Sequence, residues 1–186
     1  MIGLESLRWA LTCAFAVATM FHLVRVLRPA GAGFVDEVLH LFMGGSMIAM
    51  IWPWGSGVPA SVWVTGFTLS TGWFVSRAIV ATGSRLAPLH FAGATVAMLW
   101  MSATTSTEKS EMPGMGDMGH ERAMAAGYPA WVSAALGAYL VAAALWWTAR
   151  GMHLRPAAVA PQTPRWPEVC HATMSAAMGL ALLAMA

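Results

Sequence analysis

The stretch that decides the fold lies at the start of the chain, from Leu4 to Leu27, and its sequence is LESLRWALTCAFAVATMFHLVRVL. A transmembrane helix needs about 20 mainly apolar residues, and this run has that length. It is too long for the apolar part of a cleavable signal peptide, and no small-residue cleavage site follows it. We therefore predict that this segment is the first membrane-spanning helix.

Five further apolar runs follow, and together the six segments predict an all-α bundle that crosses the membrane about six times. Of the 186 residues, 58% are hydrophobic and only 10% are charged, whereas a soluble domain averages about 25% charged residues. Lipid offers the backbone no hydrogen-bond partners, so helices are the expected spans. The predicted helices cover approximately residues 4–27, 36–52, 59–81, 87–103, 129–148 and 167–185, within a single membrane domain, 1–186.

Charge and cysteine content argue against several other classes of protein. The net charge is only +2 and no basic cluster is present, so we expect no nucleic-acid partner. The two cysteines, Cys13 and Cys170, fall in separate apolar segments and predict no disulfide framework. The sequence contains neither a Walker A motif nor a Rossmann fingerprint, so no nucleotide-driven step is implied. We expect a multi-pass protein of the plasma membrane, with the lipid bilayer as its main surroundings.

Basic residues in the short loops predict the orientation of the chain. The loops on one side contain seven of them: Arg25, Arg28, Arg77, Arg85, Arg150, Arg155 and Arg165. The opposite loops and the N-terminus contain three: Arg8, Lys109 and Arg122. Because loops rich in Lys and Arg stay in the cytoplasm, we expect both termini to lie outside it. The loop 104–128 would then also be extracytoplasmic.

The most specific feature of the sequence is a motif that occurs twice. The second and sixth predicted helices both begin with E-V-x-H-x-x-M-x-x-x-M, from Glu37 to Met47 and from Glu168 to Met178. Positions i, i+3 and i+7 lie on one stripe of a helix, so each helix presents one histidine and two methionines to the same side. The candidate metal ligands in these two stripes are His40, Met43, Met47, His171, Met174 and Met178.

Two further histidines fall at the same depth of the predicted membrane. His90 stands near the start of the fourth predicted helix, although no glutamate precedes it and Gly93 replaces the first methionine. His22 stands five residues before the cytoplasmic end of the first helix. Together with His40 and His171, they place four of the six histidines in one layer near the cytoplasmic side.

The residue types in this layer predict a metal site. Ionisable residues in spanning helices are costly and usually face a bundle interior or a cavity. Imidazole binds copper, zinc and iron, while the soft thioether sulfur of methionine selects Cu(I). Glu37 and Glu168 would accept hydrogen bonds from the ligand imidazoles, or would instead lie at the interface as helix N-terminal acids. The alternative for each histidine is a structural role, with the ring reaching the interface or bonding a backbone carbonyl.

A second group of soft donors lies in the predicted outer loop, which contains the sequence MPGMGDMGH from Met112 to His120. Glycine and proline disfavour a stable helix there, so the sulfurs cannot form a packing stripe. Flexible thioethers suit the transient capture of Cu(I) or Ag(I), and nearby acidic residues would attract cations. The predicted capture residues are Met112, Met115, Met118 and His120. The alternative is an ordinary loop in a chain that contains 15 methionines.

These features resemble an actinobacterial membrane family known as domain of unknown function 5134. The resemblance rests on the six-helix layout, on the two His-x-x-Met pairs and on His22, His40, Met43, His171 and Met174. It implies a helical membrane protein and no particular reaction. Separately, the stretch from Met112 to His120 is similar to the methionine motifs of bacterial copper-handling proteins.

Four functions remain open on the sequence alone. We favour a non-enzymatic protein that binds, stores or passes Cu(I). The second is a b-type haem protein for electron transfer, because paired histidines on facing helices ligate haem iron. The third is an intramembrane zinc hydrolase. Its ligands would be His40, His90 and His171, with Glu37 or Glu168 as the base. The fourth is an accessory subunit of a larger membrane complex, in which the histidines are structural.

Overall fold

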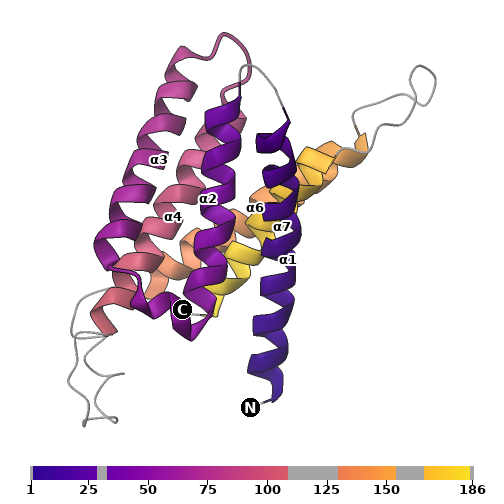
Figure 1. Ribbon diagram of the computed structural model, residues 1–186. Helices are drawn as coiled ribbons and strands as arrows, with labels where there is room; N and C mark the ends of the chain where they lie inside the picture. The colour runs from indigo at the N-terminus through magenta and orange to yellow at the C-terminus, as the bar shows by residue number, and fades with distance from the viewer. Residues whose placement is uncertain (1, 29–32, 109–129, 154–165, 185–186) are drawn as a thin grey trace. The chain divides into compact units, whose positions relative to one another are not determined.

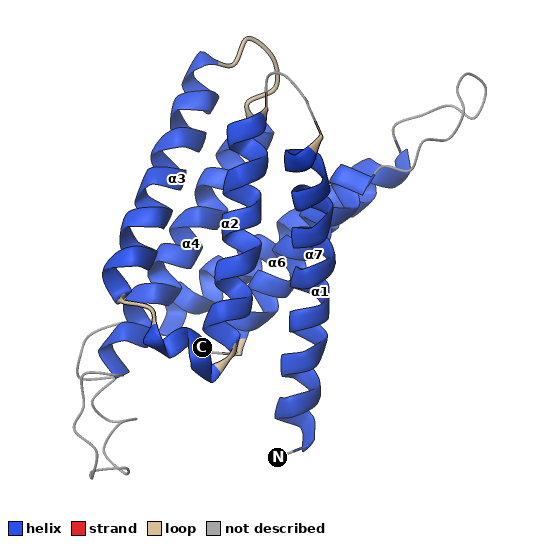
Figure 2. Cartoon of the chain, in the orientation of Figure 1, coloured by secondary structure: helices blue, strands red, loops and turns tan. Residues whose placement is uncertain are grey.

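The computed structural model describes residues 2–28, 33–108, 130–153 and 166–184, and in these ranges the chain forms helices and no strand (Figures 1 and 2). The α-helices are α1 (Ile2–Leu27), α2 (Phe34–Ile51), α3 (Ala60–Val80), α4 (Leu86–Glu108), α6 (Ala130–His153) and α7 (Trp166–Leu183). A 3-10 helix, η1 (Pro53–Gly57), follows α2. The all-α class predicted from the sequence is confirmed, and each of the six predicted helices is present.

Two of the helices end five residues beyond their predicted C-terminal boundaries. α4 continues to Glu108 where the predicted helix ends at 103, and α6 continues to His153 where the predicted helix ends at 148. In α4 the Thr104 hydroxyl donates to the Met101 carbonyl oxygen at 2.9 Å. Because this local bond satisfies the hydroxyl within the helix, a polar residue here does not end the helix. The predicted loop boundary at residue 104 therefore lies inside α4.

Four of the described helices are long and apolar enough to cross a membrane. The qualifying segments are Glu5–Leu27, Phe34–Ile51, Leu86–Thr104 and Ala130–Gly151, which belong to α1, α2, α4 and α6. These segments support the assignment to a membrane. The spanning role of α3 and α7, and the position of both termini outside the cytoplasm, stay predictions.

The chain divides into two compact units. The first unit comprises Met1–Ser56 and Ala138–Ala181, and the second comprises Gly57–Gly137 and Leu182–Ala186. The first unit thus contains α1, α2, most of α6 and most of α7, and the second contains α3, α4 and the start of α6. The single membrane domain predicted from the sequence stays a prediction.

In the first unit α1 and α2 lie side by side and run in opposite directions (Figure 1). At the end of α2 the indole Nε1–H of Trp52 donates to Thr12 Oγ1 in α1, at 3.0 Å. Trp9 packs edge-on against Trp52 with 4.9 Å between ring centroids, and the Arg8 guanidinium lies 5.7 Å from the same ring. Such aromatic groups at helix ends are typical of a membrane interface. The start of α1 therefore lies next to the end of α2, and the end of α1 lies next to the start of α2.

In the second unit α3 packs against α4. The hydroxyls of Thr71 and Thr95 form a hydrogen bond of 2.8 Å between the two helices. Trp100 Nε1–H donates to Ser133 Oγ at the start of α6, at 3.0 Å. Hydroxyl groups join membrane helices in this way because each bond satisfies a polar atom away from water. His90 is buried in this unit, where its ring contacts Phe91.

Candidate metal centre

Three of the four histidines in the predicted layer come together in the first unit. His22 belongs to α1, His40 to α2 and His171 to α7. The ring centroids of His22 and His40 lie 4.7 Å apart, those of His40 and His171 5.1 Å, and those of His22 and His171 5.9 Å. His22 and His40 are 2% and 4% exposed, and His171 is half-buried. We call these three residues the histidine cluster.

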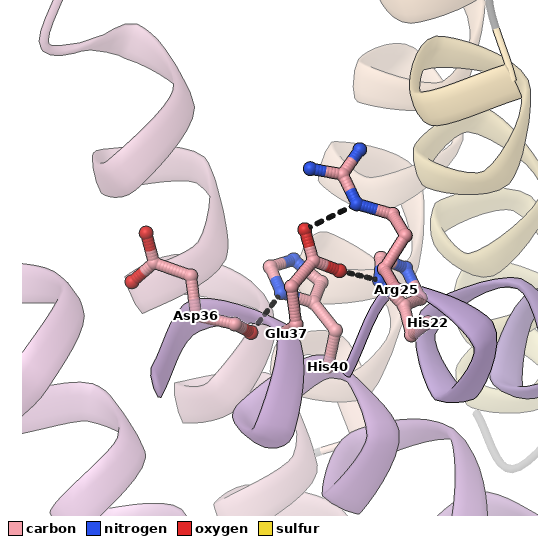
Figure 3. Close-up of polar contacts among 5 residues, drawn as sticks. All are labelled: His22, Arg25, Asp36, Glu37 and His40. Carbon is pink, nitrogen blue, oxygen red and sulfur yellow. Dashed lines mark hydrogen bonds and ion pairs between the residues drawn. The ribbon is translucent and has the colours of Figure 1, made fainter. Parts of the chain in front are cut away.

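Glu37 fixes the orientation of the His22 ring (Figure 3). His22 Nδ1–H donates to Glu37 Oε2 at 2.7 Å, and Arg25 Nε–H donates to Glu37 Oε1, also at 2.7 Å. The side-chain exposure falls along this chain of contacts, from 44% for Arg25 to 16% for Glu37 and 3% for His22. Because a carboxylate only accepts hydrogen bonds, the neutral His22 ring carries its proton on Nδ1. Its lone pair is therefore on Nε2.

A backbone carbonyl fixes the His40 ring in the same tautomer. His40 Nδ1–H donates to the Asp36 carbonyl oxygen, one turn earlier in α2, at 2.6 Å (Figure 3). A carbonyl oxygen can only accept, so the lone pair of neutral His40 is also on Nε2. Histidines that bind metals usually have this arrangement, in which one ring nitrogen donates to an oxygen and the other faces the metal.

Each of the three histidines has one buried ring nitrogen that forms no hydrogen bond to a described residue. Within the described part of the chain, no hydrogen bond reaches Nε2 of His22, Nε2 of His40 or Nδ1 of His171. Buried polar atoms in native proteins nearly always have a partner, and an exception calls for an explanation such as an ion or a water molecule. The rings contact one another, so the three nitrogens lie in one region of the first unit.

The spacing of the rings is compatible with a shared metal ion, although the side chains are not yet arranged around one. Two imidazoles on one tetrahedral metal, each with a metal–nitrogen distance of about 2.0 Å, have centroids roughly 5 Å apart. Among the residues described, no three His, Cys, Asp or Glu side chains already form a group that could hold a metal. The rings would therefore have to turn before their nitrogens converged on one ion.

The four methionines of the repeated motif are buried, as the stripe pattern predicts. Met43 and Met47 follow His40 along α2, and Met174 and Met178 follow His171 along α7. All four belong to the first unit. Thioether sulfurs thus begin one helical turn from two of the three imidazoles, because i and i+3 lie on one stripe.

The remaining candidate residues are His90, Glu168 and the residues of the predicted outer loop. His90 belongs to the second unit, whereas the histidine cluster belongs to the first. Glu168 is half-buried in the first turn of α7 beside Gly151 of α6, whose added Cβ would lie 3.9 Å from Glu168 Cβ. The proposed capture residues Met112, Met115, Met118 and His120 lie outside the described residues. The roles of Glu168 and of this loop stay predictions.

One aromatic neighbour of the cluster was missed by the sequence analysis. Trp147 of α6 is buried, and its ring centroid lies 5.6 Å from that of His171. The chain contains 10 tryptophans, so composition does not distinguish this one. Trp147 also stands at the end of the predicted span 129–148, where interfacial tryptophans are common, so no signal in the sequence would have found it.

Glu37→Gln is expected to lower the metal affinity of the cluster by about 10- to 100-fold, the usual effect of losing a group that orients a ligand histidine. The amide loses the charge that holds Arg25 and also offers a donor where His22 needs an acceptor. Isothermal titration of purified protein with Ag(I) would measure the change. Asp36→Asn is the matched control, because it removes one charge and keeps the Asp36 backbone carbonyl to which His40 Nδ1–H donates. Equal losses in both variants would contradict a positioning role for Glu37.

The fold and the site define a protein whose described residues form helices, several of them apolar and long enough to cross a membrane, with a cluster of three histidines of which two are buried. The chain belongs to the family described as a domain of unknown function, DUF5134, whose sequence profile matches residues 32–185. This confirms the family predicted from the sequence. His40 and His171 fall inside the matched range, and His22 precedes it.

The chain is also similar to mycobacterial proteins along nearly its whole length. The uncharacterized proteins Rv0970 of Mycobacterium tuberculosis and Mb0995 of Mycobacterium bovis are each 28% identical to it over 203 residues. Each alignment covers 96% of this chain and 95% of the relative. No solved structure matches the chain. Neither the family description nor these names assign a ligand or a reaction.

Proposed function

We propose that this protein is a multi-pass protein of the plasma membrane that binds Cu(I) at the histidine cluster, for storage or for passage of the ion. The observation that carries the proposal is the meeting of three imidazoles from α1, α2 and α7 inside one unit. Two of these rings have their tautomers fixed by oxygen acceptors at Nδ1, which puts the lone pair of each neutral ring on Nε2. A cluster of this kind in a membrane protein is costly unless it binds something.

Copper is preferred over zinc and iron because of the donors that surround the cluster. Zinc and iron also bind imidazole, but the soft sulfur of methionine selects Cu(I). The four buried methionines of the motif follow His40 and His171 along their helices. A Cu(I) ion leaving the imidazoles would meet thioether donors rather than alkyl groups. The two stripes therefore suit a monovalent soft ion.

A haem would fit the cluster poorly. Two axial histidines lie on opposite faces of the porphyrin, so the macrocycle must fit between the two rings. The three rings of the cluster contact one another, with centroids no more than 5.9 Å apart. A porphyrin between any two rings would displace the third. Zinc bound by His22, His40 and His171, without sulfur, is the stronger competing proposal.

The predicted orientation of the chain indicates on which side of the membrane Cu(I) would be collected and on which side it would be held. With both termini outside the cytoplasm, the end of α1 and the starts of α2 and α7 lie on the cytoplasmic side. The loop with Met112, Met115, Met118 and His120 would collect Cu(I) outside the cell, and the histidine cluster would hold it near the inner face. This arrangement suits a protein that retains or passes copper without an energy source of its own.

Elemental analysis of the full-length protein tests this proposal. The protein would be purified in detergent without added metal and then equilibrated with Cu(I), Zn(II) or haem. We expect about one tightly bound Cu(I) per chain, weaker Zn(II) binding, and no shift of the Soret band of added haem. Tight zinc binding with no copper binding would replace the copper proposal by the zinc one. Absence of any bound metal would favour an accessory subunit of a membrane complex.

A further inference from the structure

A cationic and aromatic group of residues lies where the start of α1 meets the end of α2, far along both helices from the histidine cluster. Its members all belong to the first unit and are Arg8, Trp9, Thr12 and Trp52. We call these four residues the interfacial patch. The apolar segment of α1 begins at Glu5, one turn before Arg8. The apolar segment of α2 ends at Ile51, directly before Trp52. The patch therefore lies at the depth where the hydrocarbon gives way to the lipid headgroups.

The ring of Trp52 is held in place by α1. Its Nε1–H donates to Thr12 Oγ1 at 3.0 Å, and the Thr12 hydroxyl donates in turn to the Arg8 carbonyl oxygen at 2.8 Å. Trp9 packs edge-on against the ring, with 4.9 Å between centroids, and the Arg8 guanidinium lies over it at 5.7 Å. Two side chains from adjacent positions of α1 thus converge on one fixed ring.

The charge of Arg8 is not neutralised by any carboxylate in the described part of the chain. Glu5 stands one turn earlier on α1, yet the two side chains form no ion pair. Arg25, near the other end of α1, differs in this respect because its Nε–H bonds Glu37 at 2.7 Å. Charged groups in spanning helices usually pair with an opposite charge or a carbonyl oxygen. The Arg8 guanidinium therefore calls for an anion that the described helices do not supply.

Trp9 adds a second donor beside this guanidinium. Its side chain is 57% exposed, and its indole N–H makes no hydrogen bond to a residue that the structure describes. An indole at the membrane interface pairs an apolar ring with a polar N–H that bonds in the headgroup region. An arginine fork matches two oxygens of one phosphate. The donors of the patch therefore suit a phosphate that carries an apolar chain.

We propose that the interfacial patch binds the phosphate of an anionic phospholipid such as phosphatidylglycerol. The Arg8 fork holds two phosphate oxygens, the Trp9 Nε1–H donates to an oxygen of the same headgroup, and the exposed Trp9 ring lies against the start of an acyl chain. A lipid fits better than a free phosphate ion because the patch stands at the ends of two apolar segments. This site is separate from the histidine cluster and does not depend on the proposed function.

Native mass spectrometry of the full-length protein in detergent tests this site, because it resolves each lipid that binds during a titration. The unchanged protein should bind one phosphatidylglycerol more tightly than phosphatidylcholine, whose choline cancels the phosphate charge. Arg8→Gln should weaken the binding of phosphatidylglycerol at least about tenfold, since it removes charge-assisted hydrogen bonds. Trp9→Phe keeps an aromatic ring but removes the N–H, so it should weaken the binding by about threefold.

Two matched controls are Arg28→Gln and Trp54→Phe. Arg28 is exposed just beyond the other end of α1, and Trp54 is an exposed indole in η1 without a ring contact to a described residue. Both variants should keep the affinity for phosphatidylglycerol. Circular dichroism would show whether Arg8→Gln folds. If it does not, the comparison of Trp9→Phe with Trp54→Phe still decides.

Three results would overturn the lipid site. The first is an equal loss of affinity in Arg8→Gln and Arg28→Gln, which would trace the binding to net charge alone. The second is equal affinity of the unchanged protein for phosphatidylglycerol and phosphatidylcholine. The third is displacement of the bound lipid by inorganic phosphate at an equal concentration, which would make the patch a site for the free ion.

Discussion

Alanine at His22, His40 or His171 is expected to lower the affinity for Cu(I) by at least about 100-fold in each case, which corresponds to about 3 kcal/mol. Each replacement removes one of the three imidazoles that would share the ion. Competition with a Cu(I) chelator, on full-length protein in detergent, measures the affinity. The same replacements should abolish the rise in Tm that copper causes, because that rise comes from binding to the folded state only.

His90→Ala is the matched control for these variants. His90 is also a buried histidine near a helix start, but it lies in α4 of the second unit. We expect His90→Ala to keep the Cu(I) affinity and the copper-dependent Tm of the unchanged protein. A loss as large as that of the other three would return His90 to the ligand set. Unchanged binding in all three cluster variants would remove the proposed site.

The motif and the helix directions predict that four histidines share a depth, and the rings of three of them meet. Helix length converts sequence position into depth at about 1.5 Å per residue. His40 and His171 each stand at the third residue after the motif's glutamate, in helices that start from the same side. His22 stands near the end of a helix that runs the other way. Depth is a one-dimensional quantity, so a single sequence can specify it once the spans are known.

The position of each histidine within the plane of the membrane could not be predicted from the sequence in this way. The rotation of a helix about its axis, and the identity of its neighbours, depend on side-chain packing across the whole bundle. Glu37 was predicted to orient an imidazole, but its partner is His22 on the neighbouring helix, while His40 uses the carbonyl of Asp36. His90 shares the predicted depth and yet belongs to the second unit.

Gly44 marks a close approach between α1 and α2, one helical turn from His40. A Cβ added at Gly44 would lie 2.1 Å from Thr19 Oγ1 and 3.3 Å from Thr19 Cβ. Glycine lets helices in membranes approach to such distances. Thr19 stands one turn from His22, so this contact and the two rings lie on the same interface. The separation of α1 and α2 at Gly44 therefore helps to set the distance between the rings.

Gly44→Ala is expected to lower the free energy of unfolding by about 2–3 kcal/mol, because the added methyl group overpacks the α1–α2 interface. The helices must separate, or Thr19 must leave its rotamer, before the methyl group fits. We also expect the Cu(I) affinity to fall at least about tenfold, since His22 and His40 move apart with their helices. Titration of the reconstituted protein with SDS measures the stability, and chelator competition measures the affinity.

Two companion variants separate this steric effect from helix propensity. A Cβ at Gly45 would meet nothing within 4 Å, and alanine stabilises a helix by about 1 kcal/mol relative to glycine, so Gly45→Ala should keep or raise the stability.

Thr19 Oγ1 is buried without a hydrogen bond to any described residue, so Thr19→Ala alone should cost little. Combined with Gly44→Ala, it should restore most of the lost stability and affinity, because the two positions are coupled by contact. Equal damage at Gly44 and Gly45, or no recovery in the double variant, would contradict the close approach of α1 and α2 beside the cluster.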